Sequence, residues 1–322
     1  MISLINNLSY RLTLKAFSYA RSARLVKPMP LIAQKGTLHH TFYHKPILAG
    51  EDGNNLCKEY LLDDKPCMLG RIGTIEMGVL QACLDKRAGL LKEVGEYRIN
   101  LICRNAGFFP NSEEAIEKFE KIYLDATKDV DVLGVFCNHM EDFFIKEYAP
   151  NAKLVQFTTY EPFYYEHPWS YALEGKKVLV IHPFVDSINY QYKRRELLFD
   201  NPEVLPKFEL STIKAVQTIS NNTAGFDSWF DALDYMKGEI DKADFDIALI
   251  GCGAYAYPLA SYVKRLGKKS VVTAGATQLL FGIKGARWDN AETPVPYKDT
   301  WIRPNQAETP SGSKDVENGC YW

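Results

Sequence analysis

One segment constrains the fold more than any other: an apolar run that ends in two glycines and leads into a helical pattern. The run is Asp246-Ile-Ala-Leu-Ile-Gly251-Cys-Gly253-Ala254-Tyr255-Ala256, and apolar residues then recur at helical spacing through Leu266. Gly267 is placed to end this helix, and a second β-branched run begins near Ser270. A strand, a glycine turn, a helix and a second strand predict a βαβ unit of a parallel sheet.

The same alternation extends over most of the chain. From about residue 55, short apolar runs alternate with longer amphipathic segments, as in repeated βαβ units. The clearest predicted strands are 130–136, 177–181, 246–250 and 270–274, and the clearest predicted helices are 112–126 and 226–243. We therefore predict an α/β protein with a single Rossmann-like, doubly wound and mostly parallel sheet that carries helices on both faces.

Composition divides the chain into three parts. Residues 1–30 are a basic amphipathic segment, residues 31–290 the Rossmann-like domain, and residues 291–322 a Pro-rich tail. Because the tail ends in Cys320, Tyr321 and Trp322, we expect it to wrap around the domain and dock on it.

The basic segment allows two interpretations. Its first 27 residues contain Arg11, Lys15, Arg21, Arg24 and Lys27 and no acidic residue. It lacks the unbroken apolar stretch and the cleavage site of a secretory signal. It is either a helix resting on the anionic inner face of the plasma membrane or a solvated helix packed on the domain.

Charge and cysteine content exclude several classes of protein. The 322 residues include 38 Lys and Arg against 40 Asp and Glu, which gives a net charge of −2. A chain with this charge has no overall positive field to attract nucleic acid. No apolar stretch reaches the length of about 18 residues that a transmembrane helix needs. The seven cysteines are scattered without a Cys-x-x-Cys pair, which indicates a cytoplasmic protein without disulfides or a zinc ribbon.

The glycine turn at 251–256 has the chemistry of a phosphate site. Backbone N–H groups and a helix N-terminus suit a diphosphate, which makes Gly251, Gly253, Ala254 and Tyr255 candidate ligands. The alternative is that the glycines serve packing alone. A dinucleotide site would also need an acid about 20 residues after the first glycine, and none is present at 271–278, which disfavours a nicotinamide cofactor. A P-loop motif is absent.

A second turn combines a cation and an acid. In Gly70-Arg71-Ile-Gly73-Thr74-Ile-Glu76, Gly73 is placed to cap a helix whose first turn contains Glu76. Glu76 either stabilises the helix dipole or serves in a cleft as a metal ligand or as the group that handles an acceptor proton. Arg71 is then a candidate phosphate ligand.

These motifs together resemble those of bacterial glycosyltransferases of the GT-D type, found among surface polysaccharide enzymes. The resemblance rests on 71–76, 249–259 and 278–289, with support from 176–184 and 316–322, and covers about residues 60–322. It implies a Rossmann-like enzyme that moves a hexose from a nucleoside diphosphate sugar, with a UDP-sugar favoured, to a glycan or lipid-linked acceptor. Such enzymes commonly use a divalent metal.

The family pattern has Asp-x-Glu at the first turn, where the acids contribute to metal and donor binding. Glu76 matches the second acid, but Thr74 stands in place of the first. A hydroxyl is a weaker ligand than a carboxylate for Mn²⁺ or Mg²⁺. Either Glu76 and the diphosphate hold the ion with water, or cationic side chains replace it.

Further candidates come from the remaining motifs. Gln278 begins the segment 278–289, which resembles a GT-D motif. In the same segment Lys284 and Arg287 lie near Trp288 in a glycine-flanked loop, where their charges would neutralise a phosphate. Arg194 belongs to a basic run that is either a phosphate contact or a solvated face. His182 ends a predicted strand, where ligands bind in open α/β sheets. The aromatic segment 157–173, which includes Glu161 and Glu166, is either a sugar platform or core.

Two rival functions remain. One is an NAD(P)-dependent oxidoreductase on the same fold, and the other is a non-catalytic protein that binds nucleotide sugars. Ligand binding and turnover distinguish them.

Overall fold

The structure is a computed structural model. It describes residues 45–138, 140–291 and 294–322, the backbone of 40–42, and residues 11, 12, 14–16 and 19. The predicted basic helix of residues 1–30 therefore lies largely outside the described residues, and its membrane contact stays a prediction. Within this part, the Arg11 Nε donates to the Ala88 carbonyl at 3.1 Å.

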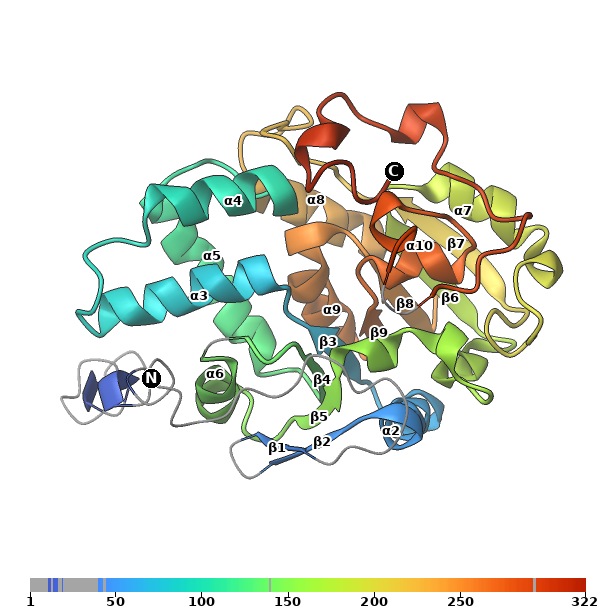
Figure 1. The fold of residues 1–322 in the computed structure, drawn as a ribbon, viewed down its shortest axis with the longest axis horizontal. Coiled ribbons are helices and arrows are strands. Elements are labelled where there is room, and N and C mark those ends of the chain that lie inside the picture. The colour runs from blue at the N-terminus through green and yellow to red at the C-terminus, as the bar shows by residue number, and fades with distance from the viewer. Residues whose placement is uncertain are drawn as a thin grey trace.

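A single sheet of nine described strands runs through the centre of the molecule (Figure 1). Its order is β1-β2-β5-β4-β3-β9-β8-β6-β7, and every neighbouring pair is parallel except β1 and β2. The strands are β1 (His40–Phe42), β2 (Lys45–Leu48), β3 (Met68–Arg71), β4 (Val132–Val135), β5 (Lys153–Gln156), β6 (Lys177–His182), β7 (Glu209–Lys214), β8 (Ile247–Ile250) and β9 (Lys269–Val272). The predicted α/β class with a mostly parallel sheet is confirmed.

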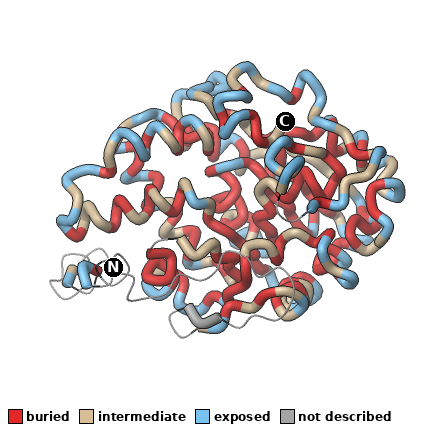
Figure 2. Tube along the Cα trace, in the orientation of Figure 1, coloured by how far each residue is buried: buried red, intermediate tan, exposed pale blue. Residues whose placement is uncertain are grey.

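Helices cover both faces of the sheet. They are α2 (Gly50–Leu62), α3 (Thr74–Arg87), α4 (Glu96–Ala106), α5 (Glu113–Thr127), α6 (Glu141–Tyr148), α7 (Val185–Tyr192), α8 (Trp229–Asp241), α9 (Ala256–Arg265) and α10 (Ala276–Leu280). Figure 2 shows buried residues along the elements in the centre of the molecule. Buried apolar residues form two cores: one contains residues of α3, α5, α8 and α9, and the other residues of α2, α7 and α10. Adjacent β8 residues Leu249 and Ile250 belong to different cores, as expected of a strand buried on both faces.

Local signals set most element boundaries. The predicted strands 130–136, 177–181, 246–250 and 270–274 correspond to β4, β6, β8 and β9. The Ser112 hydroxyl accepts the Ala115 N–H at 3.1 Å, so α5 begins where predicted. The same kind of cap at Ser228 starts α8 at Trp229, three residues after the predicted start at Phe226. Gly267, with φ of 80°, follows the end of α9.

The connections place one edge of the sheet at a topological switch. After β3 the chain builds β4 and β5 on one side, and then crosses to build β6, β7, β8 and β9 on the other. The carboxyl ends of these parallel strands share an edge, where ligands of open α/β sheets bind. The C-terminal tail crosses this edge (Figure 1), and the Arg287 N–H donates to the Cys320 carbonyl at 2.9 Å.

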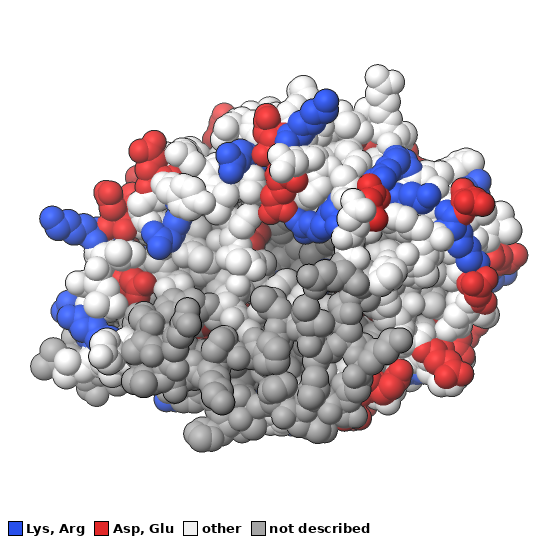
Figure 3. All heavy atoms as spheres, in the orientation of Figure 1, with Lys and Arg blue, Asp and Glu red and all other residues white. Residues whose placement is uncertain are grey.

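The described surface mixes both signs of charge. On the face drawn in Figure 3, Lys and Arg side chains are interspersed with Asp and Glu. Within the part of the chain that the structure describes, we find no helix that combines the length and apolar character needed to cross a bilayer.

Candidate functional site

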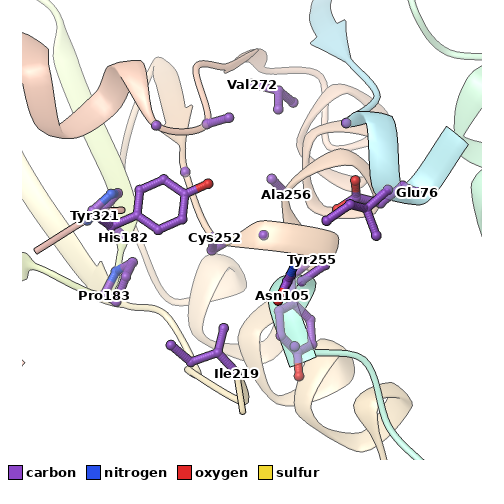
Figure 4. A pocket seen from close by; sticks show the side chains of 18 of the residues that line it. Glu76, Asn105, His182, Pro183, Ile219, Cys252, Tyr255, Ala256, Val272 and Tyr321 are labelled. Atoms are coloured by element: carbon purple, nitrogen blue, oxygen red, sulfur yellow. The ribbon is translucent and has the colours of Figure 1, made fainter. Parts of the chain in front are cut away.

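A cavity of about 430 Å³ lies at the carboxyl edge of the sheet. The segments that follow β3 through β9 all contribute to its wall, together with the end of α4 and the C-terminal tail. Figure 4 shows Glu76 on one side of this cavity and His182 and Tyr321 on the opposite side. Its position is the one that the strand order favours for a ligand.

Arg71, the last residue of β3, is a buried cation in the cavity wall with 7 % of its surface exposed. Its Nη1 donates to the Phe157 carbonyl at 3.3 Å, and its Nη2 donates to the Thr273 carbonyl. The buried Nε has no hydrogen-bond partner. Burial lowers the pKa of Arg71, and nearby Glu161 opposes this shift. The guanidinium thus joins the ends of three strands.

Glu76 is in the first turn of α3 and lines the same cavity, as do Gly73 and Thr74. Its carboxyl group lies against Gly73, which caps the helix, and it accepts the backbone N–H of Glu76 itself. Burial raises the pKa of Glu76 despite that hydrogen bond. The carboxyl group therefore stabilises the first turn of the helix and also lines the cavity, and its role as a metal ligand or as the group that handles an acceptor proton stays a prediction.

The described groups around Glu76 do not form a complete metal site. Among the described residues, no group of three or more His, Cys, Asp or Glu side chains gathers where it could hold an ion. Glu76 and the weak Thr74 hydroxyl are a poor donor set for a resident divalent cation. An ion carried in by the donor diphosphate stays a prediction, and the reaction proposed below uses none.

The two glycines of the 251–256 turn are required for packing. A Cβ on Gly251 would lie 2.6 Å from the Ala274 carbonyl oxygen and 2.9 Å from the His182 Cδ2. Gly253 has a φ of 58°, and a Cβ there would lie 2.8 Å from the Ala106 carbonyl oxygen. Both glycines also line the cavity, but the Gly251 N–H already donates to the Ile181 carbonyl at 3.0 Å, so the exposed Gly253 is the one whose backbone a phosphate can approach.

The next two residues of this turn have other contacts. Ala254 is buried outside the cavity wall, and its carbonyl accepts the Tyr123 hydroxyl at 2.7 Å. Tyr255 lines the cavity, but its ring stacks on Trp229 with centroids 5.1 Å apart. Its hydroxyl lies 2.8 Å from the Thr218 Oγ1. Tyr255 is therefore a rigid wall, and the backbone of the turn is the part left to face a ligand.

Gln278, Arg287 and Trp288 all line the cavity and hold the tail there. The Gln278 amide donates to the Tyr321 carbonyl at 3.1 Å and to the Lys284 carbonyl at 3.3 Å. Arg287 forms an ion pair with Glu317 at the cavity rim. The tail is thus part of the cavity wall.

Two predicted cations lie elsewhere. The structure places neither Lys284 nor Arg194 in the cavity wall. The loop that contains Lys284 folds onto the tail. The Lys284 N–H donates to the Ile302 carbonyl at 2.7 Å, and the Lys284 ammonium group lies 5.3 Å from the Tyr297 ring centroid. The Arg194 Nε donates to the Gln191 side-chain oxygen at 2.9 Å. Contacts to the C-terminal segment and to the end of α7 thus hold these side chains away from the cavity.

His182, at the end of β6, lines the cavity with 4 % of its surface exposed. Burial lowers its pKa to about 3, so the ring is neutral at ordinary pH.

Sequence reasoning did not identify two residues of this wall as site residues. Glu161 is considered there only as one of two carboxylates that would accept sugar hydroxyls beside an aromatic platform, and Tyr321 only as a docking group. Burial raises the pKa of Glu161 to about 7, with Arg71 opposing the shift. The terminal aromatic pair was the signal that pointed to Tyr321; nothing local distinguishes Glu161 from Glu166.

Comparisons with known proteins add little to this description. No family model and no curated protein matches the sequence. Among solved structures, one described as "Selenomethionine substituted structure of domain of unknown function 1792 (DUF1792)" is similar, with 12 % sequence identity and a TM-score of 0.34. The match covers 69 % of this chain and 82 % of that chain.

Proposed function

We propose that this protein is a glycosyltransferase that binds a nucleoside diphosphate sugar, with a UDP-hexose favoured, and transfers the hexose to a glycan or lipid-linked acceptor. One observation carries the proposal. The two turns that resemble GT-D motifs, 71–76 after β3 and 251–255 after β8, are far apart in sequence and open into one cavity.

The donor diphosphate is assigned to the Gly251 and Gly253 side of the cavity. Gly253 is exposed and lines the cavity, and α9 begins three residues after it, at Ala256, so its backbone and the helix N-terminus are the groups that would face the diphosphate. Arg71 and Arg287 are the cations of the wall that would neutralise charge on the leaving nucleoside diphosphate. Lys284 and Arg194 are not part of this assignment, because neither lines the cavity.

The first experiment is a thermal-shift screen against UDP, GDP, CDP, TDP and NADH, each with and without Mn²⁺. A ligand that binds only the folded state stabilises it by about 2.7 kcal/mol at 100 times its dissociation constant, which is readily measured. Stabilisation by a nucleoside diphosphate supports the proposal and identifies the base. Stabilisation by NADH alone favours the oxidoreductase, and no response from any of the nucleotides would contradict nucleotide binding.

Turnover separates an enzyme from a non-catalytic binding protein. We expect release of nucleoside diphosphate from a nucleotide sugar. We expect Glu76→Gln to abolish it while the melting temperature stays nearly unchanged, because the Glu76 carboxylate would assist the acceptor hydroxyl by holding it in position. Glu96→Gln is the matched control, because Glu96 is also in the first turn of a helix but outside the cavity wall. Equal turnover of wild type and Glu76→Gln would remove Glu76 from the mechanism.

A lipid-linked acceptor would account for the basic N-terminal segment, since several Lys and Arg residues together hold a protein weakly at an anionic surface. Flotation with anionic vesicles tests this contact. Protein that stays entirely in the soluble fraction would count against it.

A further inference from the structure

We propose that Glu161 is the catalytic base that accepts the proton of the acceptor hydroxyl, and that the cavity wall beyond β4 and β5 is the acceptor subsite. This inference rests on the proposed function. It assigns the acceptor to the side of the cavity that the donor does not occupy.

The strand order separates the two sides. Glu161 follows β5, whereas the glycine turn follows β8, and the order β5-β4-β3-β9-β8 puts four strand spacings between them. At about 4.8 Å per spacing this is roughly 19 Å along the sheet edge. Arg71, at the end of β3, and Glu76, after it, lie between the two sides. A donor with its phosphates at the glycine turn therefore extends its sugar towards β3, and an acceptor enters from the β5 side.

Two aromatic rings line the acceptor side. Phe136 follows β4 and Phe157 follows β5, and both belong to the cavity wall. Their rings stack with centroids 4.3 Å apart and an interplanar angle of 14°. Both side chains are only partly buried. Such aromatic surfaces pack well against the C–H faces of sugars, so this wall suits a glycan or the sugar of a lipid-linked acceptor.

The carboxyl groups of Glu76 and Glu161 differ in their contacts. Glu76 accepts an N–H at the start of α3, which fixes its orientation. No described residue donates a hydrogen bond to the Glu161 carboxyl group, and Arg71 is the charged group that opposes the rise in its pKa. Glu161 also contributes to the raised pKa values of Tyr164 and Tyr165, for which burial is the main cause. Because burial raises the pKa of Glu161 to about 7, this group can accept a proton near neutral pH.

The step is balanced as follows. The acceptor hydroxyl oxygen forms a bond to the anomeric carbon of the sugar, and its proton moves to the Glu161 carboxylate. The bond between the anomeric carbon and the phosphate oxygen breaks, and the nucleoside diphosphate leaves with that electron pair. Arg71 lies where it can stabilise the developing negative charge. Glu161 then returns its proton to water.

Glu161→Gln is the test, with Glu166→Gln as the matched control. Glu166 is exposed on the same segment and does not line the cavity. We measure binding of UDP and release of UDP from a UDP-hexose, or the corresponding nucleotide if the screen selects another base. We expect kcat of Glu161→Gln to fall by about 100-fold or more, as for loss of a general base. We expect its nucleotide affinity to stay within about twofold of wild type and Glu166→Gln to match wild type.

The pH profile gives a second readout. Since Glu161 must be ionised to accept the proton, wild-type kcat should rise with pH through about 7. Glu161→Gln should lose this dependence, and Glu161→Asp, the substitute if the Gln variant does not fold, should keep it at a lower rate. Wild-type turnover by Glu161→Gln, or loss of nucleotide binding together with turnover, would overturn the assignment. Absence of nucleotide binding by the wild type would instead overturn the proposed function itself.

Discussion

The Nδ1 atom of His182 accepts a hydrogen bond from the backbone N–H of Phe184 at 3.0 Å. Because burial lowers the pKa of His182 to about 3, the ring is neutral and its single proton is on Nε2. None of the described residues accepts a hydrogen bond from that Nε2. Since His182 lines the cavity, its Nε2–H is a donor that can reach a ligand oxygen.

We predict that His182→Asn weakens binding of the nucleoside diphosphate. The Asn Oδ1 can replace Nδ1 as the acceptor for Phe184, but the Nε2–H donor is lost. Loss of one hydrogen bond of about 1 kcal/mol corresponds to roughly fivefold in affinity. Isothermal titration with UDP measures it. An unchanged dissociation constant would show that His182 does not contact the nucleotide.

His182 should also make the stability depend on pH. Its pKa falls from 6.5 to about 3 on folding, so the unfolded chain binds more protons between these values. The stabilisation is therefore complete above about pH 6.5 and is lost as the pH falls towards 3, reaching a loss of about 2 kcal/mol at pH 5. Urea unfolding at pH 7 and pH 5 tests this in wild type and His182→Asn. Contributions from Glu141 and Glu161 have the opposite sign, because their pKa values are raised to about 7, and they cancel in the comparison. Equal pH dependence of the two proteins would contradict the prediction.

Gly251→Ala should destabilise the protein. The added methyl group would contact the Thr277 hydroxyl, the Ala274 carbonyl and the His182 ring. The Ala274 carbonyl belongs to the backbone and the His182 ring is buried, so neither can move away easily. Such overpacking costs about 1 to 3 kcal/mol. Gly238→Ala is the control, since nothing lies within 4 Å of its Cβ position in α8, and it should stabilise by about 0.5 to 1 kcal/mol. Equal free energies of unfolding for the two variants would show that the turn relaxes around the methyl group.

The sequence predicted the elements whose signals are local. A β-branched run at 246–250, a serine before α5 and a glycine at 267 each act within a few residues, and the structure has the expected strand, cap and helix end. The turns that contain Arg71 and Gly251 could be recognised for the same reason, because each pairs a strand end with the start of a helix. The start of α8 was predicted three residues too early, because Ser228 caps this helix and its signal was not used.

The rest of the cavity depends on contacts between distant segments. Lys284 was predicted from its flanking glycines, but the position of its side chain is set by Tyr297 and by the strand-like contact with Ile302. Glu161 reaches the cavity because β5 pairs with β4, which brings it towards Arg71. Tyr321 does so because Gln278 and Arg287 anchor the tail. Nothing in the local sequence encodes these pairings.

The ion pair between Arg287 and Glu317 gives the last prediction. Both residues line the cavity rim. Glu317 therefore pairs with the same guanidinium group that a phosphate of the ligand would bind. Exposed pairs of this kind contribute about 0.2 to 1 kcal/mol, so Glu317→Gln should tighten UDP binding by up to about fivefold, and added salt should reduce the difference. Asp315→Asn is the control, because it removes the same charge from the tail and leaves the Arg287 pair intact. If both variants tighten binding equally, the effect is the net charge of the tail, and Arg287 does not bind the phosphate.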